Sequence, residues 1–295
     1  MAKKFDDVRA VAAQFDARAQ RETVPLRAAF IASPSPITPP PLTQLLRGGR
    51  GGEVKIKLLL SMLWVAAAEP YDVVFPSRSW AKLLGLEDSD TKGAARINAA
   101  IRRLVQGGYL RAEKRPGQPS QLFVQNELGN GEKYFHPGKA WEAVKDADNR
   151  TRRRTPRYVR VPVEIWTHGW IAALSGPAFT MLLILLESAR GKEPENLWFA
   201  PSVAAARYGL NEATRKKGID ELERYGLVTV GQASVVRDDL SNKRRRNTYT
   251  VHTELFEEDP EDQNVPLEDV VHLLAPRVSR RREKRAAEED DFLFE

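Results

Sequence analysis

The residues of this sequence best suited to chemistry are cations grouped at the start of an amphipathic helix. The stretch 208–228, YGLNEATRKKGIDELERYGLV, has a polar cap, a helical period and a closing glycine. Its first turns carry Arg215, Lys216 and Lys217, although the positive end of a helix dipole favours acidic residues. An external polyanion would supply the missing negative charge, and a helix N-terminus already favours anions. The pattern therefore predicts a nucleic-acid contact.

Helix geometry predicts which side chains face outwards. Counting about 100° per residue from Ile219, taken as buried, gives an outer face of Ala213, Thr214, Lys217, Asp220, Glu221 and Arg224. The candidate DNA contacts of this helix are Asn211, Thr214, Lys216 and Lys217. The same count from Ile101, over a helix at 92–105, gives an outer face without acids: Lys92, Arg96, Ala99, Arg102 and Arg103. Its four cations are candidate contacts. The alternative for either helix is an ordinary solvated face.

These two helices belong to a pattern that occurs twice in the chain. The first copy has a buried helix at 57–68, a strand-like start and a helix at 73–86, the helix at 92–105, and a hairpin around a Pro-Gly turn. The second repeats this order from Trp170, with Ser175 as N-cap and Pro177 opening a buried helix. Its hairpin flanks DDLSNKRRR at 238–246. The pattern predicts an α+β chain that is mostly α with small β wings.

The second copy resembles a known class of DNA-binding unit. GLNEATRKKGIDELERYGLV at 209–228 resembles the helix-turn-helix of winged-helix regulators such as the GntR and MarR families, although Arg215 stands where they usually have Val. The first copy shares the order of elements with weaker motif identity. Two winged helices in one chain also resemble iteron-binding plasmid replication initiators. The resemblance implies two winged-helix domains in tandem, with the second helix of each helix-turn-helix in the major groove.

Further basic residues lie in the expected loops. Such residues contact the DNA backbone or minor groove and give salt-dependent affinity. The candidates are Arg115 in the first wing, Lys243, Arg244, Arg245 and Arg246 in the second wing, and Arg152, Arg153 and Arg154 between the domains. A further run, RVSRRREKR, lies at 277–285. The alternative for each run is a solvated loop.

Composition sets the predicted boundaries. We expect a charged N-terminal segment with a Pro-rich linker over 1–41, domains over 42–138 and 158–256, a basic linker over 139–157, and a charged tail over 257–295. Both ends are expected to be flexible. The final DDFLFE is expected either to recruit a protein partner or to shield a basic face.

Other functions lack their usual signals. The chain has no cysteine, and its four histidines are scattered without metal-ligand spacing. No Walker sequence or nuclease-like carboxylate cluster occurs. The apolar runs at 57–68 and 179–186 are shorter than the roughly 20 residues of a membrane span. We therefore expect a protein of the cytoplasm and nucleoid, with no enzyme activity, cofactor, metal or membrane partner.

One aromatic pair leaves two interpretations open. Trp166 and Trp170 are four residues apart, which places them on one face of a helix. They form either an aromatic seam between the domains, which is favoured, or an exposed dimerisation surface. A homodimer is accordingly one expected assembly.

The leading interpretation is a sequence-specific double-stranded DNA-binding protein, a bacterial transcriptional regulator. The formal net charge of +6 favours an anionic partner. A plasmid or phage replication initiator that binds origin repeats is the second interpretation, because no effector domain is left over. A protein-interaction adaptor built from winged helices is the third.

Overall fold

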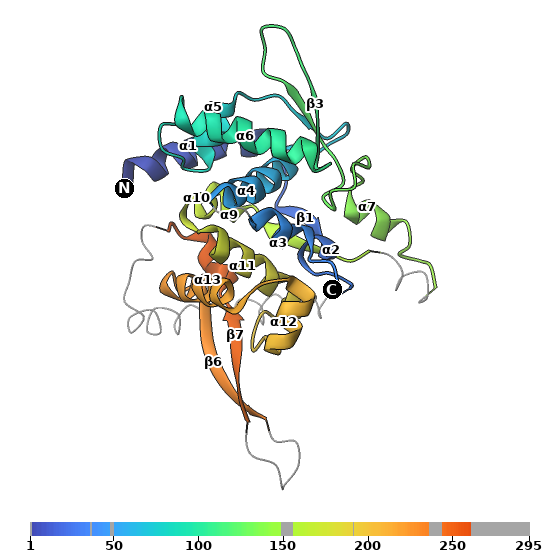
Figure 1. The fold of residues 1–295 in the computed structure, drawn as a ribbon, viewed down its shortest axis with the longest axis vertical. Helices are drawn as coiled ribbons and strands as arrows, with labels where there is room; N and C mark the ends of the chain where they lie inside the picture. Colours follow the sequence, from blue (N-terminus) through green and yellow to red (C-terminus); the bar gives the residue numbers. More distant parts are fainter. Residues whose placement is uncertain are drawn as a thin grey trace, which may run out of the picture.

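The chain has an α+β fold in which helices predominate and the sheets are small (Figure 1). The computed structural model describes residues 2–35, 37–47, 50–148, 156–190, 192–235 and 244–260. Within those ranges, no helix combines the length and the apolar character needed to cross a bilayer. The expected α+β class is confirmed.

The first unit contains a three-stranded sheet and four helices. Its elements are α3 (Pro41–Leu46), α4 (Arg50–Val65), β2 (Asp72–Val73), α5 (Ser77–Leu83), α6 (Lys92–Gln106), β3 (Leu110–Glu113) and β4 (Gln121–Val124). The strand order is β2-β4-β3, and both pairings are antiparallel. Helix α6 packs on α4 and α5. The predicted order of helices and hairpin is confirmed here.

The second unit repeats this order with a longer hairpin. Its elements are α11 (Gly176–Ala189), α12 (Pro201–Tyr208), α13 (Glu212–Arg224), β6 (Val228–Val235) and β7 (Arg244–Val251). Leu197 forms an isolated antiparallel bridge with Tyr249, as β2 pairs with the last strand of the first unit. The two hairpins point to opposite ends of the molecule (Figure 1).

The N-terminal residues are part of the folded body, contrary to the flexible segment expected over 1–41. Helix α1 (Ala2–Ala19) buries Val8, Ala12 and Phe15 against the first unit. Strand β1 (Thr23–Arg27) then pairs antiparallel with β5 (Tyr158–Pro162). Among its charged residues, Asp6, Asp7 and Arg18 are exposed, whereas Arg9 and Asp16 are half-buried. The apolar residues recur at helical spacing, and that spacing holds the segment in place.

The Pro-rich stretch after the short helix α2 (Ala28–Ile31) also contacts the body. Ser33 donates its backbone N–H to the Arg207 carbonyl of α12, at 2.8 Å. A Cβ at Gly209 would lie 2.9 Å from Pro39 Cβ, so the stretch runs close to the end of α12. It joins the units by packing between them.

Trp166 and Trp170 confirm the seam and exclude the exposed dimerisation surface. Both side chains are fully buried. The Trp166 ring stacks on Trp64 of α4 with centroids 5.4 Å apart, and its indole N–H donates to Ser61 Oγ at 2.9 Å. The pair does not share one helix, because left-handed Gly169 separates α9 (Glu164–Thr167) from α10 (Trp170–Ala173). The seam therefore joins the two units into one core.

The N-terminus of α11 is a junction at which carboxylates from both units meet. Ser175 caps the helix as predicted, and Pro177 lies in the first turn. Glu53 of α4 accepts the Gly176 N–H at 3.0 Å, while Glu221 of α13 accepts the Ser175 N–H at 2.6 Å. The prediction that Glu221 faces outwards is wrong, because capping a buried helix end draws it inwards.

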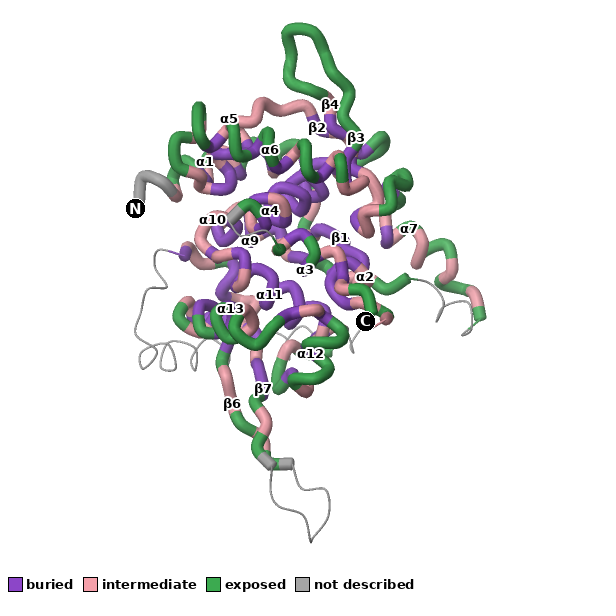
Figure 2. The backbone as a smooth tube through the Cα atoms, in the orientation of Figure 1, coloured by how far each residue is buried: buried purple, intermediate pink, exposed green. Residues whose placement is uncertain are grey.

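Figure 2 shows α4 and α11 as the buried centre, with exposed surface on the hairpins and on the outer sides of α6 and α13. Both central helices match the predicted buried helices. The remaining elements are α7 (Pro137–Glu142) and the short 3-10 helix η1 (Thr253–Glu257), whose Phe256 carbonyl accepts the Trp170 indole N–H at 3.1 Å. The part of the expected tail from 261 onwards, including DDFLFE, lies outside the described residues.

Substituting Gly218 tests the close approach of α13 to α11. A Cβ at this position would lie 2.5 Å from the Pro177 carbonyl oxygen and 2.7 Å from Met181 Cγ. We expect Gly218→Ala to lower the free energy of unfolding by about 1–3 kcal/mol, because the helix backbones must separate. Urea unfolding measures this. Gly51→Ala is the control, since nothing lies within 4 Å of a Cβ there. Equal stability of the two variants would contradict the close packing.

Acid should weaken the α11 junction through Glu53. Burial opposes the ionisation of Glu53, but Lys57, the Gly176 N–H and Arg96 outweigh it and hold its pKa below the usual 4.5. Its contribution is therefore complete above pH 4.5 and is lost as the pH falls through the lowered pKa. Urea midpoints measured from about pH 6 downwards should fall less steeply for Glu53→Gln than for the parent chain. Glu87 is exposed, so Glu87→Gln should keep the parent dependence of the urea midpoint on pH. The same dependence in Glu53→Gln would refute the role of Glu53 at this junction.

Candidate nucleic-acid interface

Helix α6 presents the cationic face that the sequence predicts. Gly93, Ile97, Ala100 and Leu104 are buried, and the opposite side is open to solvent. The exposed cations on that side are Lys92, Arg96, Arg102 and Arg103. Ile101, which served as the buried reference, is only half-buried. The expected orientation of α6 is nevertheless confirmed.

The charges on α6 are poorly neutralised. Lys92 lies 3.3 Å from Asp88 in an exposed pair, which is weak in water. Within the described ranges, no carboxylate lies within 4 Å of Arg96, Arg102 or Arg103. Three guanidinium groups therefore face solvent without an ion pair in those ranges, and Arg96 acts on Glu53 only over a longer distance.

Lys55 of α4 belongs to the same cationic group, and sequence reasoning missed it. Burial, followed by the neighbouring Arg103 guanidinium, lowers the pKa of the Lys55 ammonium. Its Nζ donates to the Arg47 carbonyl at 3.4 Å. The predicted buried helix covered 57–68, whereas α4 begins at Arg50, so Lys55 lay outside the predicted element.

The first hairpin adds cations beside α6. Residues 111–120 are all exposed. The predicted Arg115 donates to the Gln121 side chain across the hairpin, so its guanidinium is positioned but stays in solvent. Arg111, which was not predicted, lies over the Phe123 ring at 3.9 Å from the centroid. Both arginines are held in place near the hairpin strands.

Helix α13 carries less free charge than its sequence suggested. Asn211 is its N-cap, with the side-chain oxygen accepting the Thr214 N–H at 2.8 Å, so that oxygen has a structural partner. Lys216 pairs with Asp220 at 2.7 Å. Lys217 is exposed without an ion pair among the described residues, and Thr214 is half-exposed. Glu212 supplies the acid that the first turn favours, so α13 satisfies part of its own dipole.

The second hairpin separates its arginines by strand alternation. Arg245 pairs with Ser234 and Arg246 with Ala233, so their side chains point to opposite faces. Arg245 is exposed. The Arg246 guanidinium lies over the Trp198 ring, 4.1 Å from its centroid. Only the backbone of Arg244 is described, in β7. Lys243 and the linker residues Arg152, Arg153 and Arg154 lie outside the described residues.

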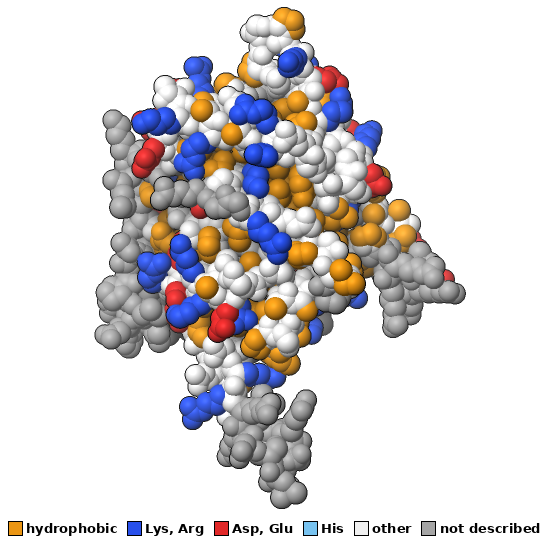
Figure 3. All heavy atoms as spheres, viewed as in Figure 1, with side chains coloured by type: hydrophobic (Ala, Val, Ile, Leu, Met, Phe, Trp, Pro, Cys, Tyr) orange, Lys and Arg blue, Asp and Glu red, His pale blue; other side chains and the backbone are white. Residues whose placement is uncertain are grey.

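One side of the molecule presents both helices. Figure 1 shows α6 and α13 on the same face, above and below the buried centre. Figure 3 shows Lys and Arg side chains spread over this face, with fewer Asp and Glu side chains scattered among them. The arrangement suits contact with an extended polyanion, and α6 supplies the less neutralised part of it.

Comparisons of the chain with protein-family models, with curated proteins and with solved structures find no match to it.

Proposed function

We propose that this chain binds double-stranded DNA in a sequence-specific way, through two winged-helix units that share one core. The cationic face of α6 carries the proposal, with Arg96, Arg102 and Arg103 exposed and without a described carboxylate partner. A DNA duplex carries about one negative charge per 1.7 Å of its axis, which matches such a face.

The topology supports a winged helix in the first unit. Its elements follow the order helix, strand, helix, helix and hairpin, and its first strand pairs with its last. In this arrangement α6 packs against α4. The second unit has the same order with Leu197 in place of the first strand. In a helix-turn-helix, the second helix enters the major groove and its first residues reach the base edges. Helices α6 and α13 are the recognition helices in this proposal.

The proposed contacts differ in kind. Arg102, Arg103 and the hairpin cations Arg115 and Arg245 contact phosphates, which fix position without reading sequence. Lys92 and Arg96, in the first half of α6, lie nearer the expected base edges. On α13, Thr214 and Lys217 are the proposed reading residues, because Lys216 is already paired.

Among DNA-binding proteins, the role that we propose first is that of a transcriptional regulator. The replication-initiator alternative is supported by one observation, which is that the described residues form two similar units on a single core and no separate third body. A footprint over an inverted repeat favours the regulator, and footprints over direct repeats favour the initiator. A homodimer is expected only for the regulator, and sedimentation of the DNA-bound protein measures this.

Removing charge from α6 tests duplex binding itself. We expect Arg102→Gln with Arg103→Gln to weaken binding to every duplex, and to reduce the slope of log affinity against log salt by about 0.9 for each phosphate that the variant no longer neutralises. Fluorescence anisotropy over a salt series measures both. The control is Lys145→Gln with Arg157→Gln, two exposed cations near α7. A parent chain whose weak binding ignores salt would favour the protein-adaptor interpretation instead.

Changing α13 tests sequence reading in the second unit. Thr214→Ala with Lys217→Gln should reduce discrimination between specific and scrambled duplexes, by about 1–3 kcal/mol for each base that the variant no longer reads. The salt slope should change little. Lys216→Gln is the matched control, because Asp220 already neutralises that cation. Equal discrimination by all three proteins would leave α6 as the only reading helix.

A further inference from the structure

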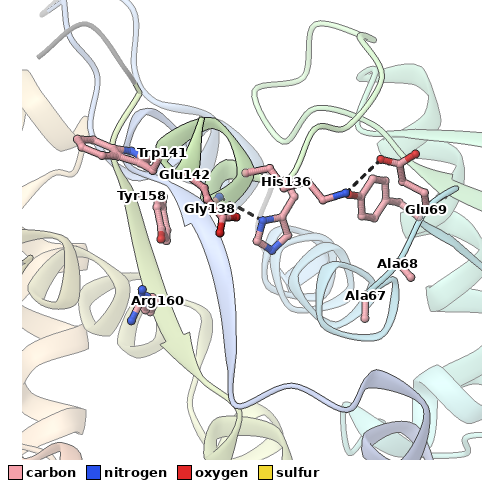
Figure 4. Close-up of a pocket in the computed structure, with 11 residues that line it drawn as sticks. Ala67, Ala68, Glu69, His136, Gly138, Trp141, Glu142, Tyr158 and Arg160 are labelled. Atoms are coloured by element: carbon pink, nitrogen blue, oxygen red, sulfur yellow. Dashed lines mark hydrogen bonds and ion pairs between the residues drawn. The ribbon is translucent and has the colours of Figure 1, made fainter. Parts of the chain in front are cut away.

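A large hollow lies where the connection between the two units runs beside the chain that follows α4. It has a volume of about 830 Å³, within the roughly 300–1,000 Å³ usual for small-molecule sites. Its walls come from the chain after α4, from α7 and from β5 (Figure 4). The residues important for binding are Tyr71, His136, Lys139, Trp141, Tyr158 and Arg160.

Aromatic side chains provide flat surfaces in this hollow. The Trp141 ring is fixed, because its indole N–H donates to the Pro156 carbonyl at 2.7 Å. Tyr158 projects from β5 beside it (Figure 4). A Cβ at Gly138 would lie 3.0 Å from His136 Cε1 and 3.7 Å from the Tyr158 hydroxyl, so the glycine keeps this space open. A planar ring fits between such walls.

His136 offers a hydrogen-bond donor at the centre of the hollow. Its Nδ1 accepts the Gly138 N–H at 3.1 Å. Burial, followed by the cations Arg21, Lys139 and Arg27, lowers the pKa of His136, which keeps the ring neutral at neutral pH. The one proton of the neutral ring is then on Nε2, since Nδ1 is an acceptor. Figure 4 shows the ring between Tyr158 with Arg160 on one side and Glu69 on the other.

The charges around the hollow favour an anion. Lys139 is paired with Glu69 at 3.4 Å, and the Arg27 guanidinium is paired with buried Glu127. Arg160 is exposed at the wall, and none of the described carboxylates lies within 4 Å of it. Its guanidinium is available for a carboxylate or phosphate, which arginine binds through paired hydrogen bonds. Glu69 and Glu142 also line the hollow, so Arg160 is the cation of the lining that makes no ion pair with the described residues.

We propose that this hollow binds a small planar anion, which is a flat aromatic ring bearing one carboxylate or one phosphate group. The ring lies against Trp141 and Tyr158. The anionic group accepts hydrogen bonds from Arg160 and from His136 Nε2. Aromatic acids and nucleoside monophosphates share this chemistry. The site is separate from the cationic face of α6, and its existence does not depend on DNA binding.

Isothermal titration calorimetry without DNA tests the site on the full chain. The probes are 4-hydroxybenzoate and AMP, with phenol and adenosine as their uncharged counterparts. We expect at least one anionic probe to bind at least tenfold more tightly than its counterpart, because the charge contacts Arg160 and His136. Preference for AMP or for 4-hydroxybenzoate identifies the source. An absence of binding by both anions at millimolar concentration would overturn the proposal.

Two variants tie the binding to this hollow. Arg160→Gln should weaken the anionic probe about tenfold, while Arg157→Gln, an exposed arginine three residues away on the same stretch, should not. Ala68→Phe, at an exposed position on the wall, should abolish binding by filling the space while leaving the urea midpoint unchanged. Equal affinity of the Arg160 and Arg157 variants, or full binding by Ala68→Phe, would place the ligand elsewhere.

Discussion

The N-terminus of α11 is the constraint on which the rest of the structure depends. Apart from Pro177 and Ser188, no residue of this helix is even half-exposed, so its free N–H groups must find partners inside the protein. Glu53 and Glu221 supply them, one from each unit, and the carboxylates also complement the helix dipole. Each carboxylate therefore fixes the helix that carries it. Because α6 packs on α4, the bond from Glu53 positions the first candidate helix, and the bond from Glu221 positions the second directly.

The acids that pair with arginines elsewhere in the protein do not neutralise the cations on α6. Glu187 accepts hydrogen bonds from Arg190, Arg207 and Tyr208 in the interior of the second unit, and Glu127 holds Arg27 in the first. Both acids are buried and already make ion pairs, although the Arg207 side chain that pairs with Glu187 is itself exposed. The outer side of α6 has no acid, so its arginines remain unneutralised.

The local parts of this design were predictable, and the long-range parts were not. The outer face of α6, the Asn211 and Ser175 caps and both hairpins follow from helical period and turn chemistry, which act over a few residues. Glu221 was misplaced because its partner lies 46 residues away. The segment 1–41 was misread because its strand pairs with β5, far along the chain. The hollow at His136 also escaped prediction, since three distant segments form it.

The two candidate helices differ in how far their own residues neutralise their N-terminal charge. At the start of α13, the Asn211 cap and the Glu212 carboxylate offset the positive end of the helix dipole, and Asp220 pairs with Lys216. Near the first turns, this leaves Lys217 as an exposed cation without an ion pair among the described residues. In α6, the cap Thr91 makes no side-chain hydrogen bond, the first turn has no acid, and three arginines face solvent. A helix that has no acid in its first turn, and whose guanidinium groups make no ion pair with the described residues, gains more from a phosphate backbone than one that pairs its own cations. In the proposed complex, α6 therefore provides most of the electrostatic affinity, although the sequence motif is clearer in α13.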